Sequence, residues 1–107
     1  MLLKAYCVHD AKALQYHAPF FTSTDGSALR SFADLANDTA TTVGRHPNDY
    51  SLWCCGTYDD NTGHINPNLP LLHIADASSL LKPQNDFFKP SPQISSPQNL
   101  STKKSKK

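Results

Sequence analysis

The sequence predicts an α+β domain: a small antiparallel or mixed sheet of about four strands with one main helix, in the order β-β-α-β-β. Three observations support this fold class. The 107 residues suffice for one domain, and apolar runs alternate with turn-forming residues. Pro, Ser and Lys become frequent after residue 80. We therefore expect a compact domain over residues 1–80 and a disordered, basic tail over residues 81–107.

Two apolar runs near the N-terminus predict the first two strands. Residues 2–8 read LLKAYCV, and residues 19–24 read PFFTST. Pro19 stands at the start of the second run, where a missing backbone N–H is tolerated. The segment between them, residues 9–18, has no clear periodicity and is predicted to be a loop.

The best helix signal is DGSALRSFADLAND, residues 25–38. Thr24 or Asp25 can cap its start, because either side chain can accept a hydrogen bond from a free N–H of the first turn. An apolar stripe follows at helical spacing: Leu29, Phe32, Ala33 and Ala36. Arg30 and Asp34 lie four residues apart on the polar side and can form a weak ion pair.

The strongest strand signal is DYSLWCCGTY, residues 49–58. Alternation assigns its side chains to two faces: Tyr50, Leu52 and Cys54 on one, and Trp53, Cys55 and Thr57 on the other. Because both faces are largely apolar, the strand is central, or its second face is covered by another subunit. A domain of this size buries only about 60% of its unfolded-chain surface, so we expect either marginal stability or stabilisation by self-association as a homo-oligomer.

Residues 56–65, GTYDDNTGHI, predict a hairpin that joins this strand to a short returning strand. Gly63 can adopt the left-handed conformation that a hairpin of three to five residues needs. Asp59 and Asp60 suggest a calcium loop, but the chain contains no Glu to complete an EF-hand. Residues 71–75 predict a further edge strand, and residues 76–81 a last helical turn.

Charge is distributed unevenly along the chain. Residues 1–80 contain four Lys or Arg and eight Asp, a net charge of −4, whereas residues 81–107 contain six Lys and one Asp, a net charge of +5. Such asymmetry indicates a polyanionic partner. The tail lysines are the candidate nucleic-acid-binding residues: Lys82, Lys89, Lys103, Lys104, Lys106 and Lys107. The alternative is a solvated tail that aids solubility.

Aromatic side chains offer a second contact with nucleic acid. Tyr6, Tyr16, Trp53 and Tyr58 can stack on bases if they are exposed, and otherwise they pack in the core or the hairpin. Phe87 and Phe88 interrupt the polar tail and can dock on the body or on a partner.

The cysteines Cys7, Cys54 and Cys55 are odd in number, and two are adjacent, which does not suggest a disulfide framework. Together with His9 and His64 they allow a zinc site, but no C-x-x-C spacing is present. No common catalytic motif and no apolar run of membrane-spanning length occurs. The sequence therefore predicts a nonenzymatic protein without cofactor or metal, in a reducing cytoplasm and without membrane contact.

Five segments in order resemble the small nonstructural protein of gokushovirus-type microviruses, which are single-stranded DNA phages. HDAKA (9–13) is similar to the family's D-x-K-A, APFF (18–21) to its P-F-F strand, and ALRSFADLAND (28–38) to its A-x-R-x-F…N-D helix. HPNDYSLW (46–53) resembles its H-P-x-D-[YF]-x-L segment, and GTYDDNTG (56–63) its G-x-[YF]-D-D-x-T-G hairpin.

This resemblance covers about residues 5–75 and implies a viral, non-capsid protein in the cytoplasm of the infected bacterium. It implies a DNA-associated accessory protein that acts in DNA binding or in the switch from duplex replication to single-strand synthesis and packaging. Together with the lysine-rich tail, the sequence predicts a protein that binds DNA nonspecifically during single-strand genome synthesis or packaging. The alternative is an adaptor for a viral replication or packaging protein, without direct DNA contact. The family usually has non-thiol residues where Cys54 and Cys55 stand, and the tail has no counterpart in it.

Overall fold

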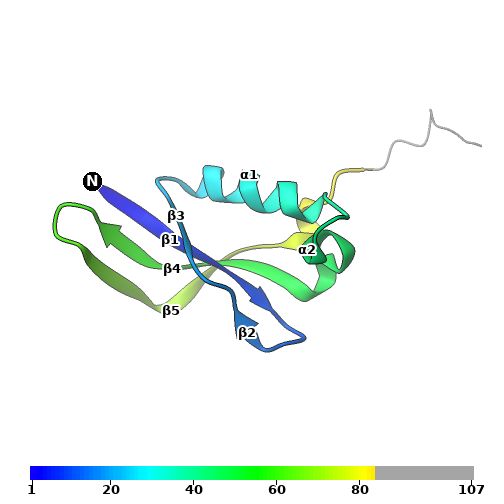
Figure 1. The fold of residues 1–107 in the computed structure, drawn as a ribbon, viewed down its shortest axis with the longest axis horizontal. Helices are drawn as coiled ribbons and strands as arrows, with labels where there is room; N and C mark the ends of the chain where they lie inside the picture. The colour runs from blue at the N-terminus through cyan, green and yellow to red at the C-terminus, as the bar shows by residue number, and fades with distance from the viewer. Residues whose placement is uncertain (84–107) are drawn as a thin grey trace, which may run out of the picture.

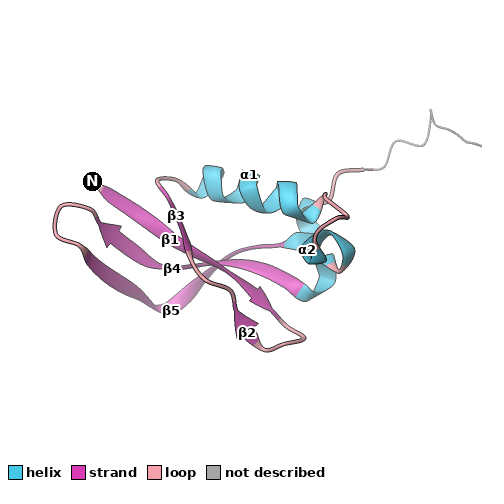
Figure 2. Ribbon diagram, in the orientation of Figure 1, coloured by secondary structure: helices cyan, strands magenta, loops and turns pink. Residues whose placement is uncertain are grey.

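The computed structural model describes residues 1–83, which form a sheet covered on one face by helices (Figures 1 and 2). Its elements follow in this order: β1 (Leu2–Asp10), β2 (Gln15–Tyr16), β3 (Phe20–Thr22), α1 (Asp25–Ala36), α2 (Thr42–Arg45), the 3-10 turn η1 (Pro47–Asp49), β4 (Tyr50–Asp59), β5 (His64–Asp76) and the 3-10 turn η2 (Ala77–Leu80). The predicted combination of a sheet with one main helix is confirmed.

All strand pairings are antiparallel, and the strands lie in the order β2-β1-β4-β5. β3 also pairs with β1, at Lys4, Ala5 and Tyr6, whereas β2 pairs with the end of β1. The two long strands β1 and β4 therefore occupy the centre of the sheet, and β5 forms one edge. The central position predicted for the strand that carries Trp53 is confirmed.

The prediction of a loop over residues 9–18 was wrong at both of its ends. β1 continues to Asp10, and Gln15–Tyr16 return beside it as β2. The Asp10 carboxylate accepts hydrogen bonds from the backbone N–H groups of Lys12 and Ala13 at 3.0 and 3.1 Å, which closes the turn. The turn depends on the Asp10 side chain and on the left-handed backbone conformation of Leu14 (φ 54°). Neither feature produces a periodic pattern in the sequence.

The two separate strands predicted after the hairpin are a single strand, β5, of 13 residues. Its pairing with β4 is irregular between Cys54 and Gly56, where Pro67 and Pro70 stand in β5. Proline cannot donate to a ladder, but an edge strand with irregular pairing tolerates it. The prolines mask the continuity of this strand in the sequence.

Helix α1 begins at the predicted cap and buries one stripe. The Thr24 hydroxyl accepts the N–H of Ser27 at 3.1 Å, so Thr24, and not Asp25, is the N-cap. Ala28, Phe32 and Ala36 are buried at i, i+4 and i+8, while Leu29 is partly buried. The predicted stripe is thus confirmed at Phe32 and Ala36, with its centre displaced toward Ala28.

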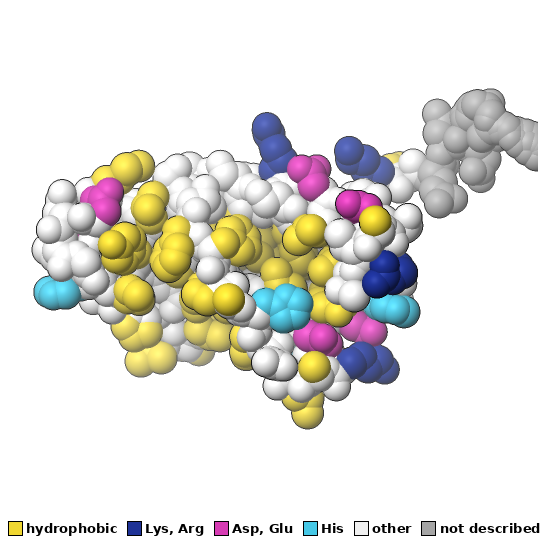
Figure 3. Space-filling view, in the orientation of Figure 1, with side chains coloured by type: hydrophobic (Ala, Val, Ile, Leu, Met, Phe, Trp, Pro, Cys, Tyr) yellow, Lys and Arg dark blue, Asp and Glu magenta, His cyan; other side chains and the backbone are white. Residues whose placement is uncertain are grey.

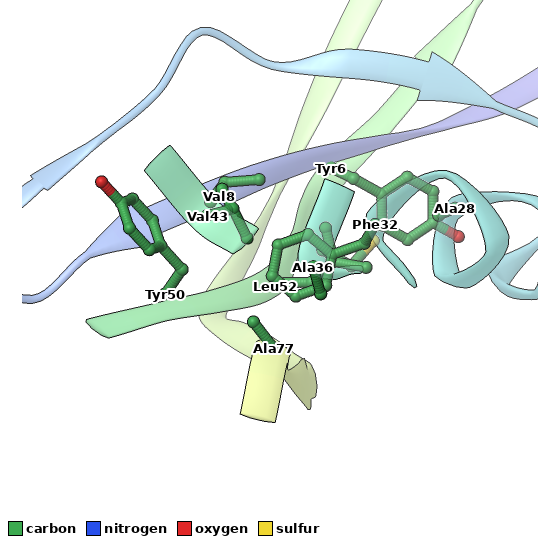
Figure 4. Packing of buried hydrophobic residues seen from close by; sticks show 10 residues of the cluster. Tyr6, Val8, Ala28, Phe32, Ala36, Val43, Tyr50, Leu52 and Ala77 are labelled. Carbon is green, nitrogen blue, oxygen red and sulfur yellow. The ribbon is translucent and has the colours of Figure 1, made fainter. Parts of the chain in front are cut away.

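The core lies between α1 and one face of the sheet, which we call the covered face. Side chains from β1 and β4 meet those of the helical segments there (Figure 4). Its members are Tyr6, Val8, Ala28, Phe32, Ala36, Val43, Tyr50, Leu52, Cys54 and Ala77. The predicted grouping of Tyr50, Leu52 and Cys54 on one face is therefore confirmed, and that face is the covered one.

A β-bulge at Cys55 changes the side chains presented by the second half of β4. Tyr6 pairs with Cys54, but the next pair along is Ala5 with Gly56, so Cys55 is an extra residue. Thr57 therefore shares a face with Lys4 and not with Trp53, contrary to strict alternation. A Cβ at Gly56 would lie 2.4 Å from the backbone oxygen of Asn66, so β5 passes too close for any side chain.

The hairpin between β4 and β5 has four residues, from Asp60 to Gly63. Gly63 has a φ of 76°, as predicted, and its N–H donates to the Asp59 carbonyl at 2.7 Å. The Asp59 carboxylate accepts the Asn61 N–H, and Asp60 pairs with the N-terminal ammonium at 2.8 Å. Both aspartates thus hold the hairpin and the N-terminus in place.

Asn37 fixes the point at which the chain leaves the body. Its amide donates to the carbonyls of Ala33 and Leu80 at 2.8 and 3.0 Å, and its carbonyl oxygen accepts the Lys82 N–H at 2.8 Å. The predicted disordered tail, with Lys89, Lys103, Lys104, Lys106 and Lys107, begins here and lies outside the described residues from 84 onward. No helix within residues 1–83 is long and apolar enough to cross a membrane.

Candidate nucleic-acid interface

The sheet face opposite the core, which we call the open face, is lined by apolar and aromatic side chains. Alternation along the strands and their register assign thirteen residues to it: Leu3, Ala5, Cys7, His9, Tyr16, Phe21, Ser51, Trp53, Tyr58, Ile65, Pro67, His73 and Asp76. The helical residues of the core cluster all lie against the covered face. The open face therefore has no helical layer among the residues described.

Aromatic contacts link several strands of the open face, and one of them reaches across β1. Phe21 of β3 lies beside Tyr58 of β4 with ring centroids 5.6 Å apart. Trp53 contacts His73 edge-on at 5.0 Å, and His9 contacts Tyr16 at 4.5 Å. These contacts hold the rings in defined orientations with part of their surface still accessible.

Several large apolar side chains of the open face are exposed to solvent. Tyr16 is 45% exposed, Phe21 44% and Ile65 62%, while Trp53 and Tyr58 are half-buried. Ala5 and Cys7 lie buried between the larger side chains. Among the thirteen residues, Asp76 is the one Lys, Arg or Asp, and it lies at the end of β5 beside His73. Hydrophobic side chains gather over the sheet in Figure 3, whereas most charged side chains in that view lie toward α2.

Hydrogen bonds hold the central part of the open face. The Trp53 indole N–H donates to the Ser51 hydroxyl at 2.9 Å, which fixes the ring along β4. His73 Nε2 lies 2.9 Å from an Asp76 carboxylate oxygen. A ring held in this way loses less conformational entropy when a ligand stacks on it.

The thiols occupy separate environments. Cys54 is in the core, whereas Cys7 is buried under the open face and the Cys55 thiol donates to the Ala5 carbonyl at 3.4 Å. Burial, and next the nearby Cys55, raises the pKa of Cys7 to about 12. The Cys7 thiol is therefore protonated at neutral pH and is a poor nucleophile.

The zinc hypothesis requires four ligands: Cys7, His9, one of Cys54 and Cys55, and His64. Within residues 1–83 no three His, Cys or Asp side chains lie close enough to hold a metal ion. Cys7 and His9 share the open face, but Cys54 points into the core and His64 starts β5 at the hairpin.

The structure separates the four aromatic residues proposed for base stacking. Tyr6 is fully buried in the core and cannot stack on a ligand, whereas Tyr16, Trp53 and Tyr58 all reach the open face. Sequence reasoning missed Phe21, Ile65 and His73 as members of this face. The alternation of Phe20 and Phe21 carried a signal for Phe21, since one of two adjacent strand residues must point away from the core.

Tyr6 has a structural role at the edge of the covered face. Its hydroxyl donates to the Asp25 carboxylate, which also lies 3.3 Å from the Lys4 ammonium. Burial is the main cause that raises the pKa of Tyr6, followed by the bond to Asp25. The pKa of Asp25 is lowered, first by the Tyr6 hydroxyl and then by Lys4. This cluster connects the start of α1 to β1.

The open face can accept flat, apolar or aromatic groups. Exposed aromatic rings on a sheet are suited to stacking with nucleic-acid bases, because every base has a π-face. They are equally suited to packing against another protein. The described part of this face contains no Lys or Arg, so a phosphate contact would need residues elsewhere in the chain.

These features define a small α+β protein with one covered and one open sheet face. A family model described as "Phage ORF5 protein" matches residues 3–80, which is most of the chain, and the protein belongs to this family. It is therefore a phage protein, as the resemblance implied. No curated protein and no solved structure matches the chain.

Proposed function

We propose that this phage protein is a nonenzymatic accessory protein that binds single-stranded DNA nonspecifically during genome synthesis or packaging in the host cytoplasm. The observation that carries the proposal is the open face, with Tyr16, Phe21, Trp53 and Tyr58 partly exposed on the strands that flank β1. Unpaired bases would stack on these rings, each stacked base contributing roughly 1–3 kcal/mol. The assignment to gokushovirus-type microviruses is part of this proposal.

The phosphates would be bound by the C-terminal lysines. The body has a net charge of −4 over residues 1–80, so long-range attraction of DNA requires the segment with a net charge of +5. Lys82 is exposed at the start of that segment, and Lys89, Lys103, Lys104, Lys106 and Lys107 follow. Such contacts supply affinity and salt dependence without base specificity.

The test uses Trp53, the only tryptophan, as the reporter. Titration with single-stranded oligonucleotides should quench its fluorescence, with an affinity that falls as salt rises. Phe21→Ser should weaken binding by roughly 5-fold or more, because it removes a stacking ring. Leu14→Ser is the matched control, since Leu14 is an exposed apolar residue in the turn after β1.

A second titration separates the role of the lysines. Replacing Lys103, Lys104, Lys106 and Lys107 by Gln should reduce the magnitude of the log–log salt slope by up to about 3, at roughly 0.7 per phosphate contact on a single strand. If the full chain shows no salt-sensitive binding and no quenching, the DNA proposal fails. If the lysine variant binds DNA with the affinity and salt slope of the wild type, the binding site lies in the body alone.

The second candidate is an adaptor that binds a viral replication or packaging protein without touching DNA. It is favoured by the scarcity of charge on the open face, where Asp76 at the end of β5 is the one Lys, Arg or Asp among the residues assigned, since the centre of a protein interface is depleted of charge and rich in aromatic residues. This reading expects Phe21→Ser to abolish binding to the purified replication initiator or capsid protein of the same phage, with no DNA-dependent quenching of Trp53.

A further inference from the structure

An open groove lies on the covered side of the molecule, beside α1, away from the open face. It has a volume of about 390 Å³ and is lined by Phe20, Ser31, Phe32, Asp34 and Leu35. The rings of Phe20 and Phe32 are apolar walls, and Leu35 is 40% exposed. We call it the α1–β3 groove. No described segment fills it, and its lining is suited to an aromatic side chain.

The C-terminal segment leaves the body close to this groove. Asn37 holds the backbone at Leu80 and Lys82, directly after the last turn of α1. Ala36, Asn37 and Pro83 line a second cavity there, and Ala36 is adjacent in sequence to Leu35 of the groove. The last described residue is thus anchored at the same end of the helix as Asp34 and Leu35.

The chain beyond Pro83 is long enough to reach the groove. Phe87 is four residues beyond Pro83, and four extended residues span up to about 13 Å. Along α1, Asn37 and Ser31 are separated by roughly 9 Å, at about 1.5 Å per residue. If the aromatic residue stood much closer to Pro83, the connecting segment would be too short to reach the groove. Phe87 and Phe88 are the only Phe, Tyr or Trp residues after Tyr58.

Charge at the rim of the groove matches the residue that follows the two phenylalanines. Asp34 lies at the rim, and within residues 1–83 its carboxylate forms no ion pair, including the one expected with Arg30. Lys89 comes directly after Phe88. A chain that places a phenylalanine ring in the groove therefore brings the Lys89 ammonium near the Asp34 carboxylate.

We propose that Phe87 and Phe88 dock in the α1–β3 groove of their own chain, with Lys89 beside Asp34. The docked segment tethers the start of the tail to α1 and leaves the lysines from Lys103 onward free. This inference does not depend on DNA binding, and it gives the groove a specific occupant on the face opposite the proposed DNA contact.

The test compares full-length variants by NMR and thermal unfolding. Phe87→Ala/Phe88→Ala should shift the amide resonances of Ser31, Phe32 and Leu35 and lower the unfolding midpoint by roughly 4 °C or more. Gln84→Ala/Asn85→Ala is the control, because it changes the same segment without removing a ring, and it should leave both unchanged. Unaltered groove resonances in the phenylalanine variant would overturn the proposal.

A double-mutant cycle with Leu35→Ser identifies the contact itself. Leu35 is partly exposed, so this variant should fold, and its effect on the midpoint should shrink clearly when Phe87 and Phe88 are already Ala. Full additivity would show that the rings do not contact the groove. Contacts between Phe87 or Phe88 and Leu35 seen between differently labelled copies in a mixed sample would instead assign the groove to a second copy.

Discussion

The two faces of the sheet come from the same strands, yet they meet different surroundings. On the covered face, Tyr6, Val8, Leu52 and Cys54 pack against α1 and the other helical segments and lie almost completely out of water. On the open face, Phe21 packs against Tyr58 and Trp53 packs against His73, and Phe21, Trp53 and Tyr58 remain partly exposed. Although β1 and β4 are apolar on both sides, only the side that α1 covers is buried in the core, and the other side remains partly accessible.

The largest expected effect lies on the covered face. Phe32→Ala removes a ring that is 1% exposed and should lower the free energy of unfolding by about 3–5 kcal/mol, through lost burial and the cavity left behind. In a domain this small, such a loss can leave part of the population unfolded at room temperature. Urea unfolding measures it, and a loss below about 1 kcal/mol would mean that α1 does not pack as described.

A smaller effect is expected at the edge of the covered face. Tyr6→Phe removes the hydroxyl that bonds Asp25 but keeps the buried ring, and should cost about 1 kcal/mol. Asp25 is half-exposed, so water can replace the lost donor, which limits the cost. The same unfolding experiment measures the change, and Tyr16→Phe, at an exposed ring, serves as the control. A cost equal to that of Phe32→Ala would contradict this assignment.

On the open face, Phe21→Ser should change the free energy of unfolding by less than about 1 kcal/mol, since nearly half of the ring is already in water. The same substitution is the one expected to weaken DNA binding, so stability and binding should separate at this position. A loss as large as that of Phe32→Ala, especially one that grows on dilution, would show that the open face is covered by another copy in solution.

The smallest expected effect is a dependence on pH below neutrality. The folded state lowers the pKa of Asp25, and it also lowers that of Asp10, chiefly through the N–H of Ala13. Their contribution is therefore fully present above the unfolded pKa of about 3.9 and is lost as pH falls through the lower folded values. The unfolding midpoint should therefore fall as the pH is lowered below about 4, and Asp25→Asn should flatten that fall. An unchanged profile in Asp25→Asn would remove Asp25 from this explanation.

Local signals explain why much of the covered face was predictable. Thr24 caps α1, Phe32 and Ala36 lie on its buried stripe, and Gly63 adopts a positive φ in the hairpin. Each feature depends on residues within one turn or one strand, where side-chain spacing and backbone preference decide the outcome. The inward set of Tyr50, Leu52 and Cys54 follows from alternation over the first half of β4 for the same reason.

The open face was harder to predict because its membership depends on register between distant strands. The bulge at Cys55 moves Thr57 to the covered face and Tyr58 to the open face, where Tyr58 meets Phe21. That bulge is a property of the pairing of β1 with β4, not of either strand alone. The continuity of β5 through Pro67 and Pro70 is likewise set by its partner strand.

The sequence by itself determined the fold class, the main helix with its cap, the apolar character of both faces of β4 and the contrast between an acidic body and a lysine-rich C-terminal segment. These features depend on composition and on spacing within short segments. Only the tertiary structure decided which aromatic residues remain accessible: Tyr6 is buried, whereas Tyr16, Phe21, Trp53 and Tyr58 share the open face. The physical reason is that α1 covers one face alone, and which ring lies on which face is set by strand pairing between residues far apart in the chain.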